Sequence, residues 1–107
     1  MTGAIEVTEF VPRGGEAAQF EAAFQHALPV LTRQHGVRRI WFGAVVEGTG
    51  SFLLLVEWVS LADHVERFRG SDDFDEFVGH FRSLLDSPAK VLHIQADPVL
   101  TAGRDAS

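Results

Sequence analysis

The segment 52–58 restricts the fold of this chain more than any other stretch, because it reads FLLLVEW and is almost wholly apolar. Side chains of a strand point alternately to opposite faces, so Leu53 and Leu55 lie on one face and Leu54 and Val56 on the other. Antiparallel strands that leave one face in water alternate between apolar and polar residues, and this segment does not. The segment therefore predicts a strand that is covered on both faces.

The rest of the pattern predicts a β-α-β-β-α-β order of elements. Alternating or apolar runs predict strands at residues 4–11, 37–47, 51–58 and 90–96. Apolar residues at helical spacing predict a helix that begins at Glu16, a short helix at 61–68, and a longer helix between Ser71 and Pro88. This is the order of an α+β, ferredoxin-like domain, in which a four-stranded antiparallel sheet carries its helices on one face. One helical layer covers one face only, so we expect a homodimer that pairs through the other sheet face.

Four residues are expected to set the ends of the helices. Pro29 interrupts the first apolar stripe and lacks a backbone donor, so it predicts a kink or an early end. Gly36 can adopt the left-handed conformation that closes a helix. Ser60 and Ser71 stand where an N-cap is expected, immediately before the second and third helices.

The length and charge of the chain exclude several classes of protein. The 107 residues hold a single domain, which we place at residues 1–97, followed by a C-terminal tail at 98–107. The net charge of −6 and the scattered basic residues argue against binding to nucleic acid or to an anionic membrane. The chain has no cysteine, and its first residues lack the pattern of a signal peptide, so we expect a cytoplasmic protein.

A family resemblance rests on the stretch 57–81, EWVSLADHVERFRGSDDFDEFVGHF. Its strand ends in Trp58, Ser60 caps a helix, Phe68 follows, and Ser71 precedes Phe74 by three residues. With these features the chain resembles the antibiotic biosynthesis monooxygenase-like proteins of the dimeric α/β-barrel superfamily, over residues 4–96. The resemblance implies two sheets packed face to face in a dimer, and a pocket in each subunit between its sheet and its helices.

The resemblance implies more than one activity. Some relatives oxidise polycyclic phenolic or anthrone-type molecules to quinones with molecular oxygen and no bound metal or flavin, whereas others degrade haem, cyclise polyketides or isomerise lactones. We expect a cofactor-independent monooxygenase that acts on a flat aromatic or polyketide-like small molecule. A polyketide cyclase or isomerase of the same fold, or a non-catalytic ligand-binding dimeric module, are the alternatives, because a fold alone does not choose among them.

Trp58 and His64 are the candidate catalytic residues. By the resemblance, Trp58 walls the pocket and orients the substrate, and His64 replaces a tyrosine that contacts the substrate phenol in quinone-forming relatives. A histidine with a pKa of about 6.5 could accept a phenolic proton. The alternatives are a core tryptophan that closes the end of the barrel and a histidine exposed on the helix surface.

The pocket is expected to be lined by aromatic side chains that also belong to the core. The expected substrate-binding residues are Phe24, Leu54, Arg67, Phe74, Phe77 and Phe81, with Phe20 as further lining and Arg82 as an alternative polar anchor. His93 faces either the pocket or the dimer partner, and its place in the last strand does not decide between them.

No haem or metal is expected. In haem-degrading relatives the iron-ligating histidine follows the Ser-x-x-Phe motif by four residues, where this chain has Val78. His80 comes two residues later, about 200° further around a helix. No two histidines have the i, i+4 spacing of a compact metal site, and the resemblance implies no other cofactor.

Overall fold

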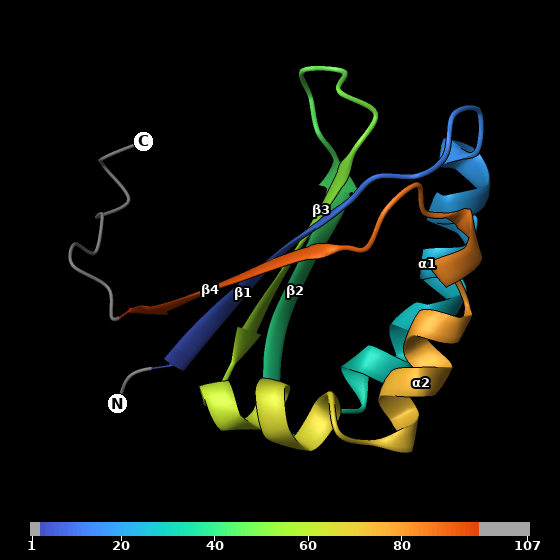
Figure 1. Cartoon of the computed structure of the whole chain (residues 1–107). Helices are drawn as coiled ribbons and strands as arrows, with labels where there is room; N and C mark the ends of the chain where they lie inside the picture. Colours follow the sequence, from blue (N-terminus) through green and yellow to red (C-terminus); the bar gives the residue numbers. More distant parts are fainter. Residues whose placement is uncertain (1–2, 97–107) are drawn as a thin grey trace.

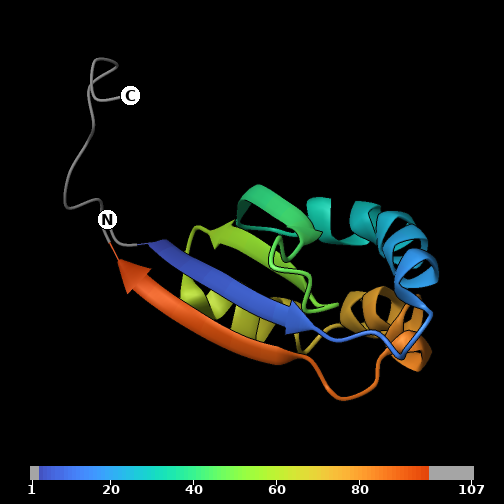
Figure 2. The same ribbon diagram turned by 90° about the horizontal axis from the view of Figure 1, so that it is seen from above.

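The computed structural model describes residues 3–96, so the predicted tail at 98–107 lies outside it. Its strands form one antiparallel sheet and are β1 (Gly3–Phe10), β2 (Val37–Ala44), β3 (Phe52–Trp58) and β4 (Lys90–Ala96). In space they follow the order β2-β3-β1-β4, so β2 and β4 are the edge strands. The helices α1 (Ala17–Thr32) and α2 (Asp72–Gly79) lie on one side of this sheet (Figures 1 and 2). The predicted α+β, ferredoxin-like fold is confirmed.

The first helix continues past Pro29, so the early end that this proline predicted does not occur. α1 continues through Pro29 to Thr32, and the turn that follows contains Gly36 with φ +89°. A Cβ at Gly36 would collide with the side chain of Asp63, and the Gly36 carbonyl accepts the backbone N–H of Val59 at 2.7 Å. Glycine is therefore required here both for its conformation and for the close approach of the segment that follows β3.

The segment after β3 contains a wide helical turn. Ser60 accepts the backbone N–H of Asp63 at 3.2 Å, as expected of an N-cap. From Asp63 to Phe68 the chain then forms a π-helix, η1, and the N–H of Arg69 donates to the carbonyl of His64 at 3.0 Å. This bond spans five residues instead of four, which changes which side chains share a face of the helix.

The last predicted helix is shorter than expected, which corrects the prediction that it continues up to Pro88. α2 ends at Gly79, and a single 3₁₀ turn, η2 (Arg82–Leu84), follows it. The chain is held in this region by residues that follow β1, because Arg13 donates to the Leu84 carbonyl at 2.9 Å. Glycine is also a poor helix former, which favours the break at Gly79.

One face of the sheet, the inner face, packs against the helices. It includes Phe52, Leu54, Val56 and Trp58 of β3, all buried. Aromatic side chains pack between α1 and the sheet, where the rings of Phe24 and Phe42 stack with centroids 3.9 Å apart. This packing accounts for the buried half of the FLLLVEW pattern.

The opposite face, the outer face, carries apolar side chains that no helix covers. The strand register places seven apolar side chains there: Ile5, Val7, Trp41, Leu53, Leu55, Leu92 and Ile94. The charged side chains of Glu9, Arg39, Glu57 and Lys90 lie on the same face. Trp41 is 48% exposed and Leu92 is 70% exposed, so one chain alone leaves this face open to water. Among residues 3–96, no helix is long and apolar enough to cross a bilayer. The cytoplasmic location stays a prediction.

Candidate active site

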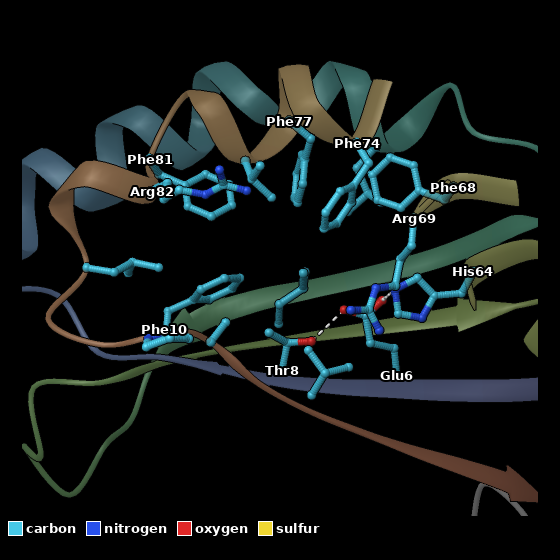
Figure 3. A pocket seen from close by; sticks show the side chains of 17 residues that line it. Glu6, Thr8, Phe10, His64, Phe68, Arg69, Phe74, Phe77, Phe81 and Arg82 are labelled. Carbon is cyan, nitrogen blue, oxygen red and sulfur yellow. Dashed lines mark hydrogen bonds and ion pairs between the residues drawn. The ribbon is translucent and has the colours of Figure 1, made fainter. Parts of the chain in front are cut away.

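A cavity of about 230 Å³ lies between the inner face of the sheet and the segment from η1 to η2 (Figure 3). Its wall is mainly apolar, and its aromatic part comes from Phe10, Phe68, Phe74, Phe77 and Phe81. Its polar groups lie toward the sheet and toward η1, where Figure 3 shows Glu6, His64 and Arg69 close together, whereas Arg82 lies at the far end. The cavity therefore combines an apolar body with one polar end.

Glu6 is a buried carboxylate in the middle of β1. Its Oε1 accepts the indole Nε1–H of Trp58 at 3.0 Å, and its Oε2 accepts the hydroxyl of Thr8. The Nε2 atom of His64 lies 3.3 Å from Oε1. Burial raises the pKa of Glu6 above its usual range, because it disfavours the charged form, and the hydrogen bonds from Thr8 and Trp58 offset this only in part.

His64 is buried between Trp58, Glu6 and the last strand. Only 3% of it is exposed, and its ring stacks on Trp58 with centroids 4.9 Å apart. Its Nδ1 lies 2.8 Å from Nε2 of His93, so His93 faces inward. Burial, and then the nearby charges of His93 and Arg69, lower the pKa of His64 to about 4. His64 is thus neutral at neutral pH, and the alternative of an exposed histidine is wrong.

The π-helix brings Arg69 into the same site. Residues five apart in an α-helix point about 140° away from each other, since each residue turns about 100°. In η1 the bond from Arg69 to His64 makes five residues close to one turn, so His64, Phe68 and Arg69 all line the cavity. Arg69 also lies within 6.0 Å of the Phe74 ring, which holds the guanidinium over an aromatic wall.

Five of the residues chosen from sequence line the cavity. They are His64, Leu54, Phe74, Phe77 and Phe81. The alternative anchor Arg82 also reaches the lining, but at the end opposite His64 (Figure 3).

Other residues chosen from sequence lie away from the cavity lining. Trp58 is fully buried behind His64 and donates to Glu6, so it does not wall the cavity. Phe24 and Phe20 belong to the aromatic core under α1. Arg67 points to solvent and lies 3.4 Å from Asp63, one turn earlier.

Sequence reasoning missed Glu6, Thr8 and Arg69, and it left open which face of the sheet His93 occupies. Glu6 and Thr8 occupy every second position of β1 and therefore share the inner face with Phe10, which is the signal that could have found them. His93 pairs with Glu6 in the strand register, on the same face. Arg69 had no such signal, because the π-helix that turns it inward is not visible in the sequence.

The other polar groups around the fold do not extend this site. His80 caps the end of α2 and is exposed. In residues 3–96, no group of three or more histidine and acidic side chains is arranged to hold a metal ion. The expectation of a metal-free and cofactor-free protein stays a prediction.

Fold and site together define a βαββαβ domain with an aromatic cavity beneath its helices and an acid–base cluster at one end. Residues 4–80 match the sequence model of the antibiotic biosynthesis monooxygenases, so the chain belongs to that family. The resemblance noted from the stretch 57–81 is thereby confirmed.

Individual relatives agree with this assignment. The chain is 40% identical to the uncharacterized protein YczJ of Bacillus subtilis over 63 residues, which are 59% of this chain and 66% of YczJ. It is also similar to a crystal structure from Bordetella bronchiseptica provisionally assigned as an antibiotic biosynthesis monooxygenase, with TM-score 0.84, 26% identity and coverage of 92% and 100% of the two chains. SnoaB of Streptomyces nogalater, a cofactor-independent oxygenase, gives TM-score 0.79 at 19% identity over 95% and 100% of the chains, which shows a shared fold.

Proposed function

We propose that this protein is a cofactor-independent monooxygenase that oxidises a flat aromatic or polyketide-like small molecule with molecular oxygen. The observation that carries the proposal is the cavity, whose aromatic walls end in a carboxylate, an imidazole and a guanidinium. An apolar slot with a few convergent polar groups suits a planar molecule that carries a phenol or ketone at one end. Membership of the monooxygenase family and the fold shared with SnoaB support the same activity.

The reaction needs a base and a place for negative charge. A phenol or anthrone reacts with oxygen once it has lost a proton, because the anion can transfer an electron to oxygen. A CH₂ group and O₂ then give a carbonyl group and one water molecule, with both hydrogens of the carbon ending on the released oxygen atom. The Glu6–His64 pair provides acid–base groups, and Arg69 stabilises the anion from the same end of the cavity.

The residues chosen from sequence take revised roles in this proposal. His64 acts in the acid–base pair through Glu6, and Trp58 positions both groups from behind the cavity instead of contacting the substrate. Leu54, Phe74, Phe77 and Phe81 contact the ring system, while Phe24 and Arg67 do not.

Oxygen uptake tests the proposal directly. Anthrones and hydroxynaphthalenes are supplied one at a time in an oxygen electrode, with protein-free buffer as the control because such molecules oxidise slowly alone. We expect one O₂ consumed per quinone formed, an unchanged rate with a metal chelator, and a rate lowered at least tenfold in His64→Gln. Uptake no faster than in buffer for every substrate would contradict the proposal.

An isomerase or cyclase is the second candidate, and one observation favours it. The contact of 3.3 Å between His64 and Glu6 can move protons without any oxidant. An anaerobic assay separates the two, since only an isomerase or cyclase retains turnover when oxygen is removed.

We also propose that two copies of the chain pair through the outer face. This face exposes Trp41, which lies opposite Leu55 of β3, and it exposes Leu92 and Ile94, which lie opposite Val7 and Ile5 of β1. A contiguous apolar surface of this kind is unusual on a monomer and typical of an interface. The cavity lies on the other side of the sheet, so each subunit keeps a complete site.

A further inference from the structure

Three side chains form a continuous line from the cavity to the edge of the sheet. Glu6 lines the cavity, and its Oε1 lies 3.3 Å from Nε2 of His64. The other ring nitrogen of His64, Nδ1, lies 2.8 Å from Nε2 of His93. Both separations allow proton transfer, given that such contacts are often longer in a protein without its ligand.

The geometry also shows which member of this line can meet a substrate. Both ring nitrogens of His64 are occupied, one by Glu6 and one by His93, so no lone pair is left for a molecule in the cavity. Glu6 differs, because its Oε2 accepts only the Thr8 hydroxyl and a carboxylate oxygen can accept two donors. Glu6 and Thr8 both line the cavity.

We propose that Glu6, His64 and His93 form a proton path that joins the cavity to solvent, and that Glu6 is the group that exchanges a proton with the substrate. This inference rests on the proposed function, because it assigns the base of the same site. His64 is a positioning and relay residue in this scheme, and His93 is the outer end of the path.

The path has two protonation states, and the hydrogen bond at each contact runs in the opposite direction in the two states. When Glu6 is ionised, His64 carries its proton on Nε2, toward Glu6, and its Nδ1 accepts the Nε2–H of His93. When Glu6 is protonated on Oε1, this acid proton faces Nε2 of His64, whose own proton sits on Nδ1 and faces His93. Passing from the protonated to the ionised state shifts three protons by one step each: from Glu6 to Nε2 of His64, from Nδ1 of His64 to Nε2 of His93, and from the outer nitrogen of His93 to water. One proton therefore leaves the path, and His64 never becomes an imidazolium.

The surroundings of the path fit this scheme. Burial keeps His64 neutral and moves the pKa of Glu6 upward, toward the pH at which a base can both take and return a proton. The charged or titratable groups that face Glu6 are His64 and Arg69 from the η1 segment and His93 from β4, while β3 provides the neutral Trp58. His93 is half-buried on edge strand β4, so its outer nitrogen can exchange with water.

A measurement without substrate tests the path first. Protein labelled with ¹⁵N in its histidine rings is followed by long-range ¹H–¹⁵N correlation between pH 5 and 9. We expect His64 to stay neutral and to change tautomer as Glu6 titrates, and we expect that change to vanish in Glu6→Gln. A His64 that keeps one tautomer throughout, or that becomes doubly protonated near pH 6.5, would overturn the path.

Kinetics test the outer end. In His93→Ala we expect kcat to fall at least tenfold in dilute buffer with KM changed less than twofold, because His93 does not line the cavity. Added imidazole should restore kcat in proportion to its concentration, whereas the exposed His26→Gln control should match wild type. An unchanged kcat, or a loss that imidazole does not restore, would refute the role of His93.

The two experiments separate this inference from the proposed function. Tautomer coupling in a protein that consumes no oxygen would support the path and refute the oxygenase. Oxygen uptake without tautomer coupling would support the oxygenase and refute the proton path.

Discussion

The candidate site depends on one buried carboxylate that three neighbours hold in place. Glu6 receives hydrogen bonds from Trp58 and Thr8, and His64 lies against the same oxygen as Trp58. A buried charge without such partners would destabilise a domain of this size severely. In residues 3–96, every buried side-chain nitrogen or oxygen has a hydrogen-bond partner. The cluster is therefore a satisfied network, and its cost to stability is confined to the desolvation of its titratable groups.

That cost predicts how stability changes with pH. The pKa of His64 is about 4 in the folded chain and 6.5 as its ordinary value, so the unfolded chain takes up this proton first as pH falls. Folded stability from this group is complete above pH 6.5 and is lost between pH 6.5 and 4, by on the order of 2–3 kcal/mol. Urea unfolding at pH 7 and 4.5 should show this loss in wild type and in the exposed His80→Gln control, and a smaller loss in His64→Gln.

The contribution of Glu6 to folding stability changes with pH in the opposite direction to that of His64, which provides an internal check on the assignment of His64. Its raised pKa favours the folded chain when the carboxyl is protonated, so its contribution is lost as pH rises above the ordinary value of 4.5. The difference in unfolding free energy between wild type and Glu6→Gln should therefore shift against wild type with rising pH. Equal pH slopes for wild type and His64→Gln would show that His64 is not buried in the neutral form.

At the scale of elements, the π-helix η1 decides which arginine belongs to the site. With α-helical spacing, Arg67 would lie one turn after His64 and would be the nearer of the two arginines. The bond from Arg69 to His64 instead closes a five-residue turn, so the exposed Arg69 lines the mouth of the cavity, whereas Arg67 lies outside it. Such a widened turn is frequent at functional sites.

A pair of matched variants tests this assignment. Arg69→Gln should raise KM for an anionic or phenolic substrate about tenfold, because it removes the cation that faces the bound oxygen, a loss of about 1.4 kcal/mol. Arg67→Gln removes the same charge from the same helix and should leave KM within twofold of wild type. A larger rise in KM for Arg67→Gln than for Arg69→Gln in steady-state assays would instead assign Arg67 to the site.

Local patterns predicted the elements well, and the site less well, for a physical reason. Strand alternation, apolar stripes and the Ser60 and Ser71 caps depend on neighbours in sequence, so the order of elements could be predicted. The 3₁₀ turn after α2 and the wide turn of η1 instead involve hydrogen bonds, from Arg13 to Leu84 and from Arg69 to His64. Those contacts leave no local trace. Arg69 was therefore beyond sequence reasoning, whereas Glu6 could have been found from the parity of β1.

At the scale of the whole molecule, two adjacent strands have their polarity reversed relative to an ordinary half-buried sheet. In β1 the inward positions include Glu6 and Thr8, while Ile5 and Val7 face outward. In β4, His93 faces inward and its apolar neighbours Leu92 and Ile94 face outward. The inward polar residues build the proton-exchanging end of the cavity, and the outward apolar residues build the outer face. The same arrangement, with polar residues inward and apolar residues outward in β1 and β4, thus builds both the site and a surface that favours a partner.

The outer face gives the last prediction, that the protein is a dimer held by this surface. Light scattering should give twice the chain mass of 11.8 kDa for wild type. Leu92→Glu should give a folded monomer, because Leu92 is 70% exposed in one chain and its replacement leaves the core intact, while a buried glutamate at the interface would lack a partner. Val46→Glu is the matched control, since Val46 is 94% exposed in the turn between β2 and β3, outside the outer face, and should stay dimeric. Monomeric wild type at micromolar concentration would leave the apolar outer half of FLLLVEW without the partner that its sequence predicts, and would point to a different molecule on this face.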